Sequence, residues 1–284
     1  MSHAFLQLNV FSKDPFKGNP LAVVKLEGGR MTDKRLKELA NWTNLSETVF
    51  LERSHKADFK ARIFTPKGEI PFAGHPSLGA LCAALHFGHT PKNKAQYKLE
   101  CGVGIVNLKK EGRQFWVEMP KAEVSTPDLV RQRLLRLLTQ FEGADSRLVN
   151  LGPKWLVAEV TSRAALLGRT PAPAEIKALC LECGAGGLTL FAQYEDQPGQ
   201  IEVRSYAPLH GIEEDPVCGS GNGAVAAYLK DTDGLKSLGS RYLATQGEAL
   251  GRQGEVQVEV VGEQIWIGGE VQIVIEGKLE GLTI

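Results

Sequence analysis

The chain has 284 residues, 43% of them hydrophobic, which is enough for two domains that each bury a core. Lys plus Arg and Asp plus Glu both number 33, so the formal net charge is zero, which argues against nucleic acid and anionic membranes as partners. The first residues lack a signal-peptide pattern and no apolar run reaches the about 18 residues of a membrane span, so we expect a cytoplasmic protein.

Strand and helix patterns alternate through the first half of the chain. Residues 4–11 (AFLQLNVF) and 20–26 (PLAVVKL) are predicted strands on either side of the turn signal FKGN. Residues 32–43 (TDKRLKELANWT) have helical spacing and begin with a Thr that can cap a helix. Two more strands are predicted at residues 47–53 and 58–66.

A buried helix is predicted next, in GEIPFAGHPSLGALCAALHFG. His75 and Pro76 open it, and Gly88 lies just past its end. Residues 78–87 are apolar on nearly every face of a helix. Such a helix is buried all round and does not lie on a surface.

The second half of the chain repeats the first. KARIFTP matches EVRSYAP, so that Arg62 corresponds to Arg204, which is 142 residues later. PFAGHP at 71–76 matches PVCGSG at 216–221, an apolar helix (224–229) follows again, and GNPLAVV has an echo in GPKWLVAEV. We therefore predict an α+β fold of two pseudo-symmetric domains, each a curved, barrel-like mixed sheet wrapped around a central apolar helix.

The two matching helix starts, Gly74-His75 and Gly219-Ser220, predict a binding site. In a pseudo-twofold pair of domains they would face each other across one cleft. A helix N-terminus presents unpaired N–H groups and a positive dipole end. Two of them at one cleft would hold a small anion, most simply a carboxylate.

The glycines at 219–223 do not indicate a nucleotide site. A dinucleotide fingerprint needs a hydrophobic strand directly before it, whereas GIEEDP is charged and contains a proline. A P-loop needs GxxxxGK[ST], which is absent from the sequence.

Five cysteines form an odd, sparse set that is typical of a reducing compartment. Cys180 and Cys183 make a single CxxC pair, and zinc would need a second pair of ligands. Together with the absence of HExxH or comparable spacing, this predicts no metal site. A redox dithiol stays open, but we interpret the pair as two thiols on an apolar helix face.

Glu47, in NLSETVF, breaks the symmetry of the duplication, because the counterpart region GAGGLTLFA holds no acid. A carboxyl group flanked by Leu45, Val49 and Phe50 would have a raised pKa, as a proton-transferring acid or base needs. Acids at strand edges are often simply solvated, so the residues alone leave both interpretations open.

Three further residues near the helix starts are candidates for proton handling. Asp215 ends the acidic run 213–215, which would form a solvated turn or hold an amine. His75 is the one histidine within a helix-start motif, and the other five are interpreted as surface or incidental. Cys218 precedes a helix, where a thiol becomes more acidic. Because its first-half counterpart is Ala73, a half-buried lining role for Cys218 stays open.

Four motifs in order, FKGNPLAVV, LSETVFL, RIFTPKGEIPFAGHPSLGA and GIEEDPVCGSGNGA, together resemble the PhzF-like phenazine biosynthesis family. The match runs from Phe11 to about Leu229. It implies the diaminopimelate epimerase-like fold, an active site between the two domains, a homodimer and no cofactor. Chain ends in this fold return to the first domain, so we assign residues 1–121 and about 274–284 to the first domain and 122–273 to the second.

The resemblance also implies roles for single residues. The proton-shuttling glutamate of the family falls on Glu47, its GHP histidine on His75 and its EDP aspartate on Asp215. The implied substrate-binding set is Gly74, His75, Gly219, Ser220 and Asn19, with the helix-start amides holding the substrate carboxylate.

One departure from the family concerns Cys218, where Thr is frequent. Epimerases and racemases of the wider fold pair a Cys at this point with a second Cys, but this chain has Ala73 there. We expect an isomerase in which Glu47 moves a proton on a small carboxylate-bearing substrate. Two alternatives stay open: an amino- or imino-acid epimerase that uses Cys218 with Glu47, and a non-catalytic small-acid binding or interaction module.

Overall fold

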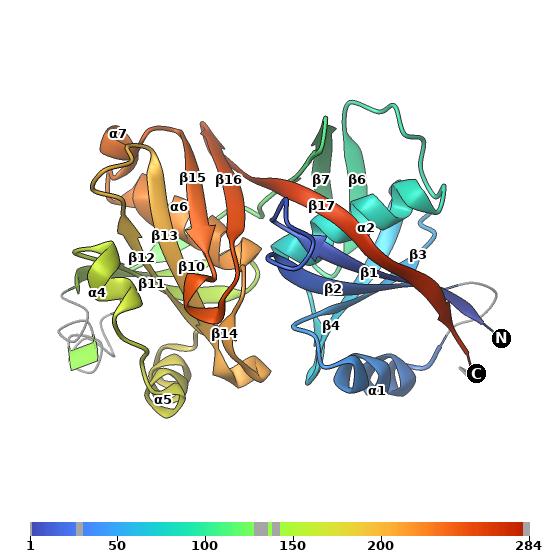
Figure 1. Cartoon of the computed structure of the whole chain (residues 1–284), viewed down its shortest axis with the longest axis horizontal. Coiled ribbons are helices and arrows are strands. Elements are labelled where there is room, and N and C mark those ends of the chain that lie inside the picture. The colour runs from blue at the N-terminus through green and yellow to red at the C-terminus, as the bar shows by residue number, and fades with distance from the viewer. Residues whose placement is uncertain (1, 27–30, 128–135, 138–142, 281–284) are drawn as a thin grey trace. The chain divides into compact units, whose positions relative to one another are not determined.

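The computed structural model describes residues 2–26, 31–127, 136–137 and 143–280 (Figure 1). The chain forms two compact units: unit 1 is Met1–Glu118 with Gly268–Ile284, and unit 2 is Met119–Ile267. The domain borders expected from the sequence, after residue 121 and before residue 274, stay predictions, since compactness alone does not define a domain.

Within its described residues, unit 1 contains two helices and has most of its strands before residue 119. Its elements are β1 (His3–Val10), β2 (Asn19–Lys25), α1 (Asp33–Thr43), β3 (Thr48–Glu52), β4 (Phe59–Thr65), β5 (Gly68–Ile70), α2 (Gly74–His86), β6 (Tyr97–Cys101), β7 (Gly104–Glu111), β8 (Gln114–Glu118) and the later part of β17 (Gln264–Leu279).

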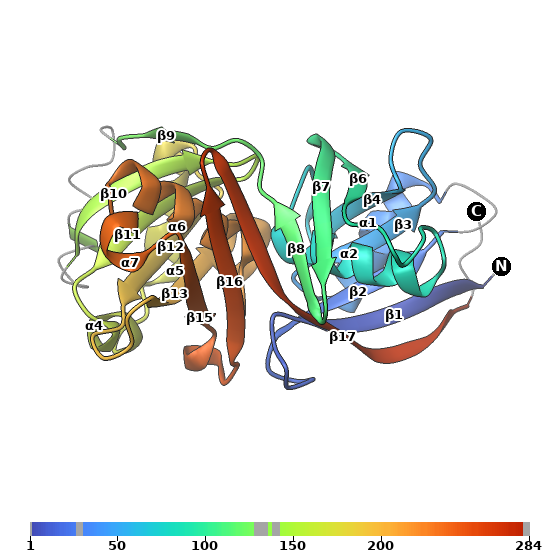
Figure 2. The same cartoon turned by 90° about the horizontal axis from the view of Figure 1, so that it is seen from above.

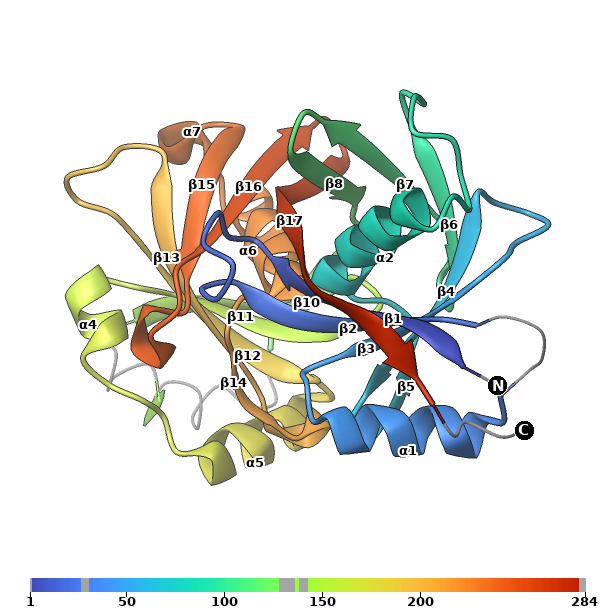
Figure 3. The same cartoon turned by 45° about the vertical axis from the view of Figure 1, so that its right-hand side comes forward.

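Eight strands of unit 1 close into a barrel-like ring in the order β1, β2, β3, β4, β6, β7, β8, β17 and back to β1. Figure 2 shows β6, β7 and β8 side by side in this ring. Helix α2 packs against strands around the ring, and α1 packs on β3, β4 and β5 (Figure 3). From Gly74 to Leu85 every residue of α2 except Cys82 is buried, as the all-apolar sequence predicts.

The described residues of unit 2 contain the remaining elements. They are β9 (Glu123–Ser125), β10 (Gly143–Asn150), β11 (Lys154–Val160), α4 (Arg163–Leu167), α5 (Pro173–Cys183), β12 (Gly187–Gln193), β13 (Gln200–Ala207), η2 (Pro208–His210), β14 (Ile212–Asp215), α6 (Gly219–Asp231), α7 (Leu235–Leu238), β15 (Arg241–Gln246), η3 (Glu248–Leu250), β16 (Gly254–Val261) and the start of β17.

The strand order confirms the duplication read from the sequence. In unit 1 the pairs along β1-β2-β3-β4-β6-β7 are antiparallel, parallel, antiparallel, parallel and antiparallel. The pairs along β10-β11-β12-β13-β15-β16 in unit 2 have the same senses in the same order. Each sheet encloses one buried helix, α2 or α6, so the expected α+β class is confirmed.

The matched arginines make matched ion pairs. Arg62 on β4 donates two hydrogen bonds to Glu69 on β5, at 2.8 and 2.5 Å. Arg204 on β13 donates two to Glu214 on β14, at 2.9 and 2.8 Å. The second pair is the less exposed one, with the Arg204 and Glu214 side chains 2% and 9% exposed, and Arg204 also donates to backbone carbonyls of the α4–α5 segment.

Two local readings of the sequence differ from the structure. The acidic run before Pro216 is strand β14 and not a solvated turn, because Glu214 pairs with Arg204 and Asp215 is buried. His3 is buried and not a surface residue, since its ring Nδ1 lies 3.3 Å from the Lys25 carbonyl across the β1–β2 pair.

The CxxC cysteines lie on α5 and face the unit 2 core. Both are free thiols; Cys180 is buried in an apolar cluster and Cys183 packs at its edge. Burial raises the pKa of Cys180 to about 12 and also raises that of Cys183. Thiols held in the protonated form are poor redox nucleophiles, which supports the packing interpretation.

Candidate active site

Three predicted residues of unit 1 meet at the start of α2. Glu47 lies directly before β3, Asn19 opens β2, and His75 is the second residue of α2. The His75 Nε2 atom lies 3.4 Å from Glu47 Oε2, and the Asn19 amide Nδ2 lies 3.4 Å from His75 Nδ1. All three side chains are buried: Asn19 is 0%, His75 2% and Glu47 6% exposed. Tertiary structure thus brings together three residues from separate motifs.

The glycine of the KGN motif sets the position of Asn19. Gly18 donates its N–H to Asn9 Oδ1 at 2.8 Å, while the Asn9 amide donates to the carbonyls of Ser12 and Asp14. A Cβ on Gly18 would lie 2.2 Å from the Val10 carbonyl oxygen. Only glycine allows this close approach of the backbone, which places Asn19 at the first position of β2.

His75 is a neutral imidazole at physiological pH. Although Nε2 is within ion-pair distance of Glu47, burial lowers the pKa of His75 to about 3. Ser46 donates to Asn19 Oδ1 at 3.1 Å, which turns the amide N–H of Asn19 toward His75 Nδ1. Because that N–H donates, Nδ1 accepts and the ring proton is assigned to Nε2, on the Glu47 side.

The neutral ring leaves a buried donor available. Among the described residues, His75 Nε2 has the 3.4 Å ion-pair contact with Glu47 Oε2 but no hydrogen bond. Buried polar atoms in native proteins nearly always have a partner, so an orphaned one at a helix start points to a bound ligand. The atom is therefore a candidate contact for substrate.

The strand registers locate the counterpart of Glu47 in unit 2. Thr48, which follows Glu47, pairs with Phe64, and Leu188, which follows Gly187, pairs with Tyr206. Phe64 and Tyr206 are themselves matched across the duplication. Glu47 therefore corresponds to Gly187, and the structure agrees with the sequence that one copy alone carries an acid here.

The predicted residues of unit 2 meet at the start of α6. Asp215 ends β14 and is 4% exposed, and its Oδ1 accepts the Val217 N–H at 3.2 Å. Cys218 is the N-cap residue of α6, and Gly219 and Ser220 are its first two helical residues. Cys218 is 3% exposed and its Sγ lies 3.7 Å from the Ser220 hydroxyl.

A buried glutamine that the sequence reading missed holds this segment. Gln246, at the end of β15, accepts the Cys218 N–H and the Asn222 amide through Oε1, at 3.1 and 3.0 Å. Its Nε2 donates to the Asp215 carbonyl at 2.9 Å. One side chain thus fixes both sides of the Pro216-Val217 turn. No motif marked Gln246, because its partners are 24 to 31 residues away in sequence.

A tryptophan also missed by the sequence reading orients Ser220. The Trp155 indole N–H donates to Ser220 Oγ at 3.2 Å, and Trp155 stands next to Gly187 in the β11–β12 pair. A Cβ on Gly187 would lie 2.4 Å from the Trp155 ring. In unit 2 the indole therefore takes the space that a side chain at the Glu47-equivalent position would need.

At the starts of α2 and α6, the same two backbone N–H groups are without a cap. No side chain caps α2, and its third residue, Pro76, has no N–H. In α6 the third N–H, from Gly221, is taken by Cys218 Sγ at 3.3 Å. The uncapped N–H groups are thus those of the first two residues in each helix, Gly74-His75 and Gly219-Ser220. That these amides bind an anion stays a prediction.

Sequence comparison places the chain in a known family. The family model for phenazine biosynthesis-like proteins, PhzC-PhzF, matches residues 8–277. The chain belongs to this family. Residues Asn19, Glu47, His75, Asp215 and Cys218 all lie within the matched range.

Individual relatives match over nearly the whole chain. The antisense-enhancing sequence 1 protein of Schizosaccharomyces pombe is 32% identical and aligns over 97% of this chain and 98% of its own length. An uncharacterized isomerase of Clostridium acetobutylicum is 28% identical over 96% of each chain. The solved structure of a predicted epimerase from Pseudomonas aeruginosa matches with a TM-score of 0.81 at 28% identity, over 98% of this chain and 99% of its own.

Two features are absent from the described residues. No helix there is long and apolar enough to cross a membrane. No group of three or more His, Cys, Asp or Glu side chains in the described part of the chain has the spacing to hold a metal ion.

Proposed function

We propose that this protein is an isomerase that moves a proton on a small carboxylate-bearing substrate, without a cofactor and with Glu47 as the general acid/base. The observation that carries the proposal is the buried Glu47–His75 pair at the start of α2, which has no acid at the equivalent position of unit 2. The isomerase class is also supported by the names of relatives such as the Clostridium protein, an uncharacterized isomerase.

The proton chemistry follows from the protonation state of the pair. A carboxylate near the start of a helix and out of bulk water can accept a proton from a substrate carbon and return it at another. The neutral His75 donates through Nε2 and does not itself carry a charge to the reaction. Asn19, which fixes the other ring nitrogen, keeps that donor on the Glu47 side.

Substrate binding is assigned to the helix starts. The N–H groups of Gly74 and His75, and those of Gly219 and Ser220, are donors suited to carboxylate oxygens. Asp215 is assigned to an amino or hydroxyl group of the substrate. We further propose that both groups of residues act on the same substrate molecule, in a cytoplasmic homodimer, as the family resemblance implies.

The experiment that tests the proposal is proton NMR in D2O with a panel of small carboxylic and amino acids that includes dihydro-hydroxyanthranilate. Wild type is compared with Glu47→Gln, which keeps the shape of the side chain and removes its acid–base function. Deuterium should enter one compound with wild type and at least about 100-fold more slowly with the variant. Full exchange activity in Glu47→Gln would refute the assignment.

A second candidate is an amino- or imino-acid epimerase in which the Cys218 thiol acts opposite Glu47. The observation that favours it is the position of Cys218 Sγ at the start of α6, where it accepts the Gly221 N–H. A thiol at a helix N-terminus is the usual setting of a reactive cysteine. Exchange with racemisation of one amino acid, lost in Cys218→Ser, would select this candidate.

A further inference from the structure

A closed set of polar contacts holds the ring of His75 in unit 1. The Ser46 hydroxyl donates to Asn19 Oδ1 at 3.1 Å, and the Asn19 amide Nδ2 lies 3.4 Å from His75 Nδ1. The other ring nitrogen, Nε2, lies 3.4 Å from Glu47 Oε2. Because Ser46 and Glu47 are consecutive residues, the contacts begin and end on one short segment. We call these four residues the histidine network.

The strand registers give the counterpart of each network residue in unit 2. Ala22 on β2 faces Thr48 on β3. Leu156 on β11 faces Leu188, the counterpart of Thr48, on β12. Helices α2 and α6 align at their first residues. The corresponding pairs are therefore Asn19 and Pro153, Ser46 and Gly186, Glu47 and Gly187, and His75 and Ser220.

All four side chains of the network differ between the two copies. The counterparts are a proline, two glycines and a serine, so these positions of unit 2 hold neither the amide nor the carboxylate. Ser220 instead accepts a hydrogen bond from the Trp155 indole at 3.2 Å. The sheet and its buried helix form in both units. The fold therefore does not need the network, whose other members occur in the copy that carries the acid.

Asn19 is placed to orient the ring of His75. Its side chain is 0% exposed, and both ends of its amide are engaged, Oδ1 by Ser46 and Nδ2 by His75. An amide turned the other way would present Oδ1 to the ring and would hold the ring proton on Nδ1. The hydrogen bond from Ser46 to Oδ1 favours the first orientation. The family resemblance implies a substrate contact for Asn19, whereas these contacts favour a positioning role.

The position of the ring proton decides which group faces Glu47. With the proton on Nε2, an N–H donor faces the carboxylate. With the proton on Nδ1, the Nε2 lone pair would face a carboxylate oxygen at 3.4 Å. Two acceptors at this distance repel each other unless one of them takes up a proton. A protonated Glu47 could not begin the reaction as a base.

We propose that Ser46 and Asn19 are positioning residues that keep the ring proton of His75 on Nε2, the nitrogen beside Glu47. Neither side chain contacts the substrate in this role. The inference rests on the proposed function, because the Nε2 donor serves catalysis only if Glu47 moves the proton. The state of the ring itself exists without substrate and is measured without turnover.

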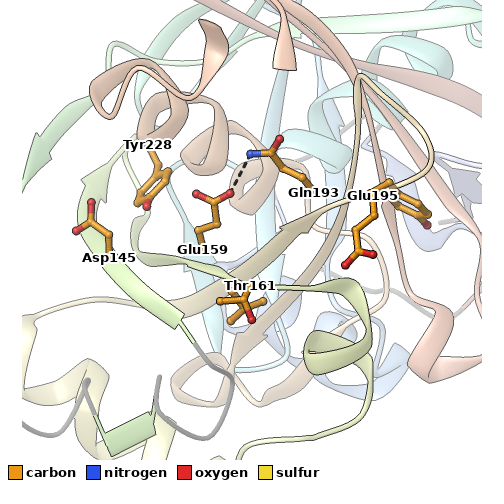
Figure 4. Close-up of a pocket in the computed structure, with 8 residues that line it drawn as sticks. Asp145, Glu159, Thr161, Gln193, Glu195 and Tyr228 are labelled. Carbon is orange, nitrogen blue, oxygen red and sulfur yellow. Dashed lines mark hydrogen bonds between the residues drawn. The ribbon is translucent and has the colours of Figure 1, made fainter. Parts of the chain in front are cut away.

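NMR of the 15N-labelled full chain near neutral pH identifies which imidazole nitrogen carries the proton, and His75→Gln assigns the His75 signals. We expect the proton on Nε2 in wild type. Asn19→Asp should place a proton on Nδ1, because a carboxylate can only accept. Figure 4 shows Gln193, whose amide donates to Glu159 in a pocket of unit 2. The matched control Gln193→Glu makes the same amide-to-acid change and should leave the His75 signals as in wild type.

Exchange kinetics distinguish positioning from substrate contact. With the compound that takes up deuterium, Asn19→Asp should lower kcat at least about 10-fold and change KM by less than about threefold. Ser46→Ala should lower kcat about 3- to 10-fold through one lost hydrogen bond, and Ser46→Thr should restore it. Ser237→Ala, at an exposed position of α7, is the control and should exchange as wild type does.

Three outcomes would overturn the proposal. They are a proton on Nδ1 in wild type, an unchanged ring state in Asn19→Asp, and a raised KM with unchanged kcat in Asn19→Asp, which would make Asn19 a substrate contact. Thermal unfolding checks that each variant is folded. If Asn19→Asp does not fold, Ser46→Ala at its half-buried position provides the test, and wild-type ring signals with wild-type kcat would overturn the proposal.

Failure of this inference and failure of the proposed function are distinguishable. Full exchange activity in Glu47→Gln would refute the proposed function and would leave the Nε2 assignment of His75 intact. A proton on Nδ1 in wild type would refute the positioning role and would leave Glu47 as the candidate acid/base.

Discussion

Glu47 and Gly187 occupy the same register position in two copies of one fold, and only the first carries a side chain. In unit 2 the Trp155 ring and the Tyr206 carbonyl oxygen would each lie 2.4 Å from a Cβ on Gly187. The acid is therefore absent from unit 2 for a packing reason. The indole that excludes it donates to Ser220, a residue that we propose binds substrate.

The first prediction concerns this packing. Gly187→Ala should destabilise the protein by about 1–3 kcal/mol, because the added methyl group meets a buried ring and a backbone atom. Gly277→Ala is the control, since nothing lies within 4 Å of its Cβ position, and its effect should stay within about 0.5 kcal/mol. Urea unfolding measures both, and equal effects would contradict the assigned clash.

Because His75 is buried, we predict that the free energy of unfolding depends on pH. Burial lowers the pKa of His75 from 6.5 to about 3, so between these values the unfolded chain binds a proton that the folded chain does not. The free energy of unfolding should therefore fall as pH decreases from about 6 to 4, with a contribution of about 1.4 kcal/mol per pH unit from this residue.

Unfolding in urea at several pH values measures that slope. His75→Gln should show a slope smaller by the His75 contribution. The exposed His55 is the control, and His55→Gln should keep the wild-type slope. An unchanged slope in His75→Gln would mean that the ring is protonated in the folded state.

Cys218 distinguishes the two candidate reactions. If Glu47 acts alone, Cys218→Ser should retain proton exchange within about tenfold, because a hydroxyl can cap α6 in place of the thiol. Cys218→Ala should lose about 1 kcal/mol of stability through the missing cap. A loss of exchange of 100-fold or more in Cys218→Ser, measured by NMR in D2O, would instead assign a general-base role to the thiol.

Gln246 is predicted to position the start of α6. Gln246→Leu removes the acceptor of the Cys218 N–H and the donor to the Asp215 carbonyl, which leaves buried groups unpaired at about 1–3 kcal/mol each. Proton exchange should fall together with substrate affinity. Gln257→Leu on the neighbouring strand β16 is the control, because its half-buried side chain has no such contacts. Wild-type exchange in Gln246→Leu would remove the positioning role.

Arg62 and Arg204 lie at equivalent positions of the two units, so they test how burial changes the strength of an ion pair. Arg204→Met leaves Glu214, whose side chain is only 9% exposed, without its partner and should cost about 3–5 kcal/mol. Arg62→Met breaks a pair whose acid, Glu69, is 42% exposed, so the loss should be within about 1 kcal/mol. Chemical unfolding compares the two, and equal losses would show that burial does not decide the strength of these pairs.

The repeated architecture follows from the order of residue types along the chain. Local patterns of residue types mark Arg62 and Arg204, the two glycine-rich helix starts and the apolar helices. Because the same patterns occur in both halves of the chain, both halves form the same strands and helices. Glu47 could also be identified from the sequence alone, because its counterpart segment lacks an acid. Each of these features is a matter of residue type and order along the chain.

The side chains that hold those motifs in place come from distant parts of the chain, so they become visible in the folded structure and not in the sequence. Gln246 is 28 residues from Cys218 and Trp155 is 65 residues from Ser220, so no local pattern joins them. The neutral state of His75 likewise depends on burial by elements that are far away in sequence. Hydrogen bonds and desolvation act over a few ångströms of space, and the folded sheets alone bring these groups within that range.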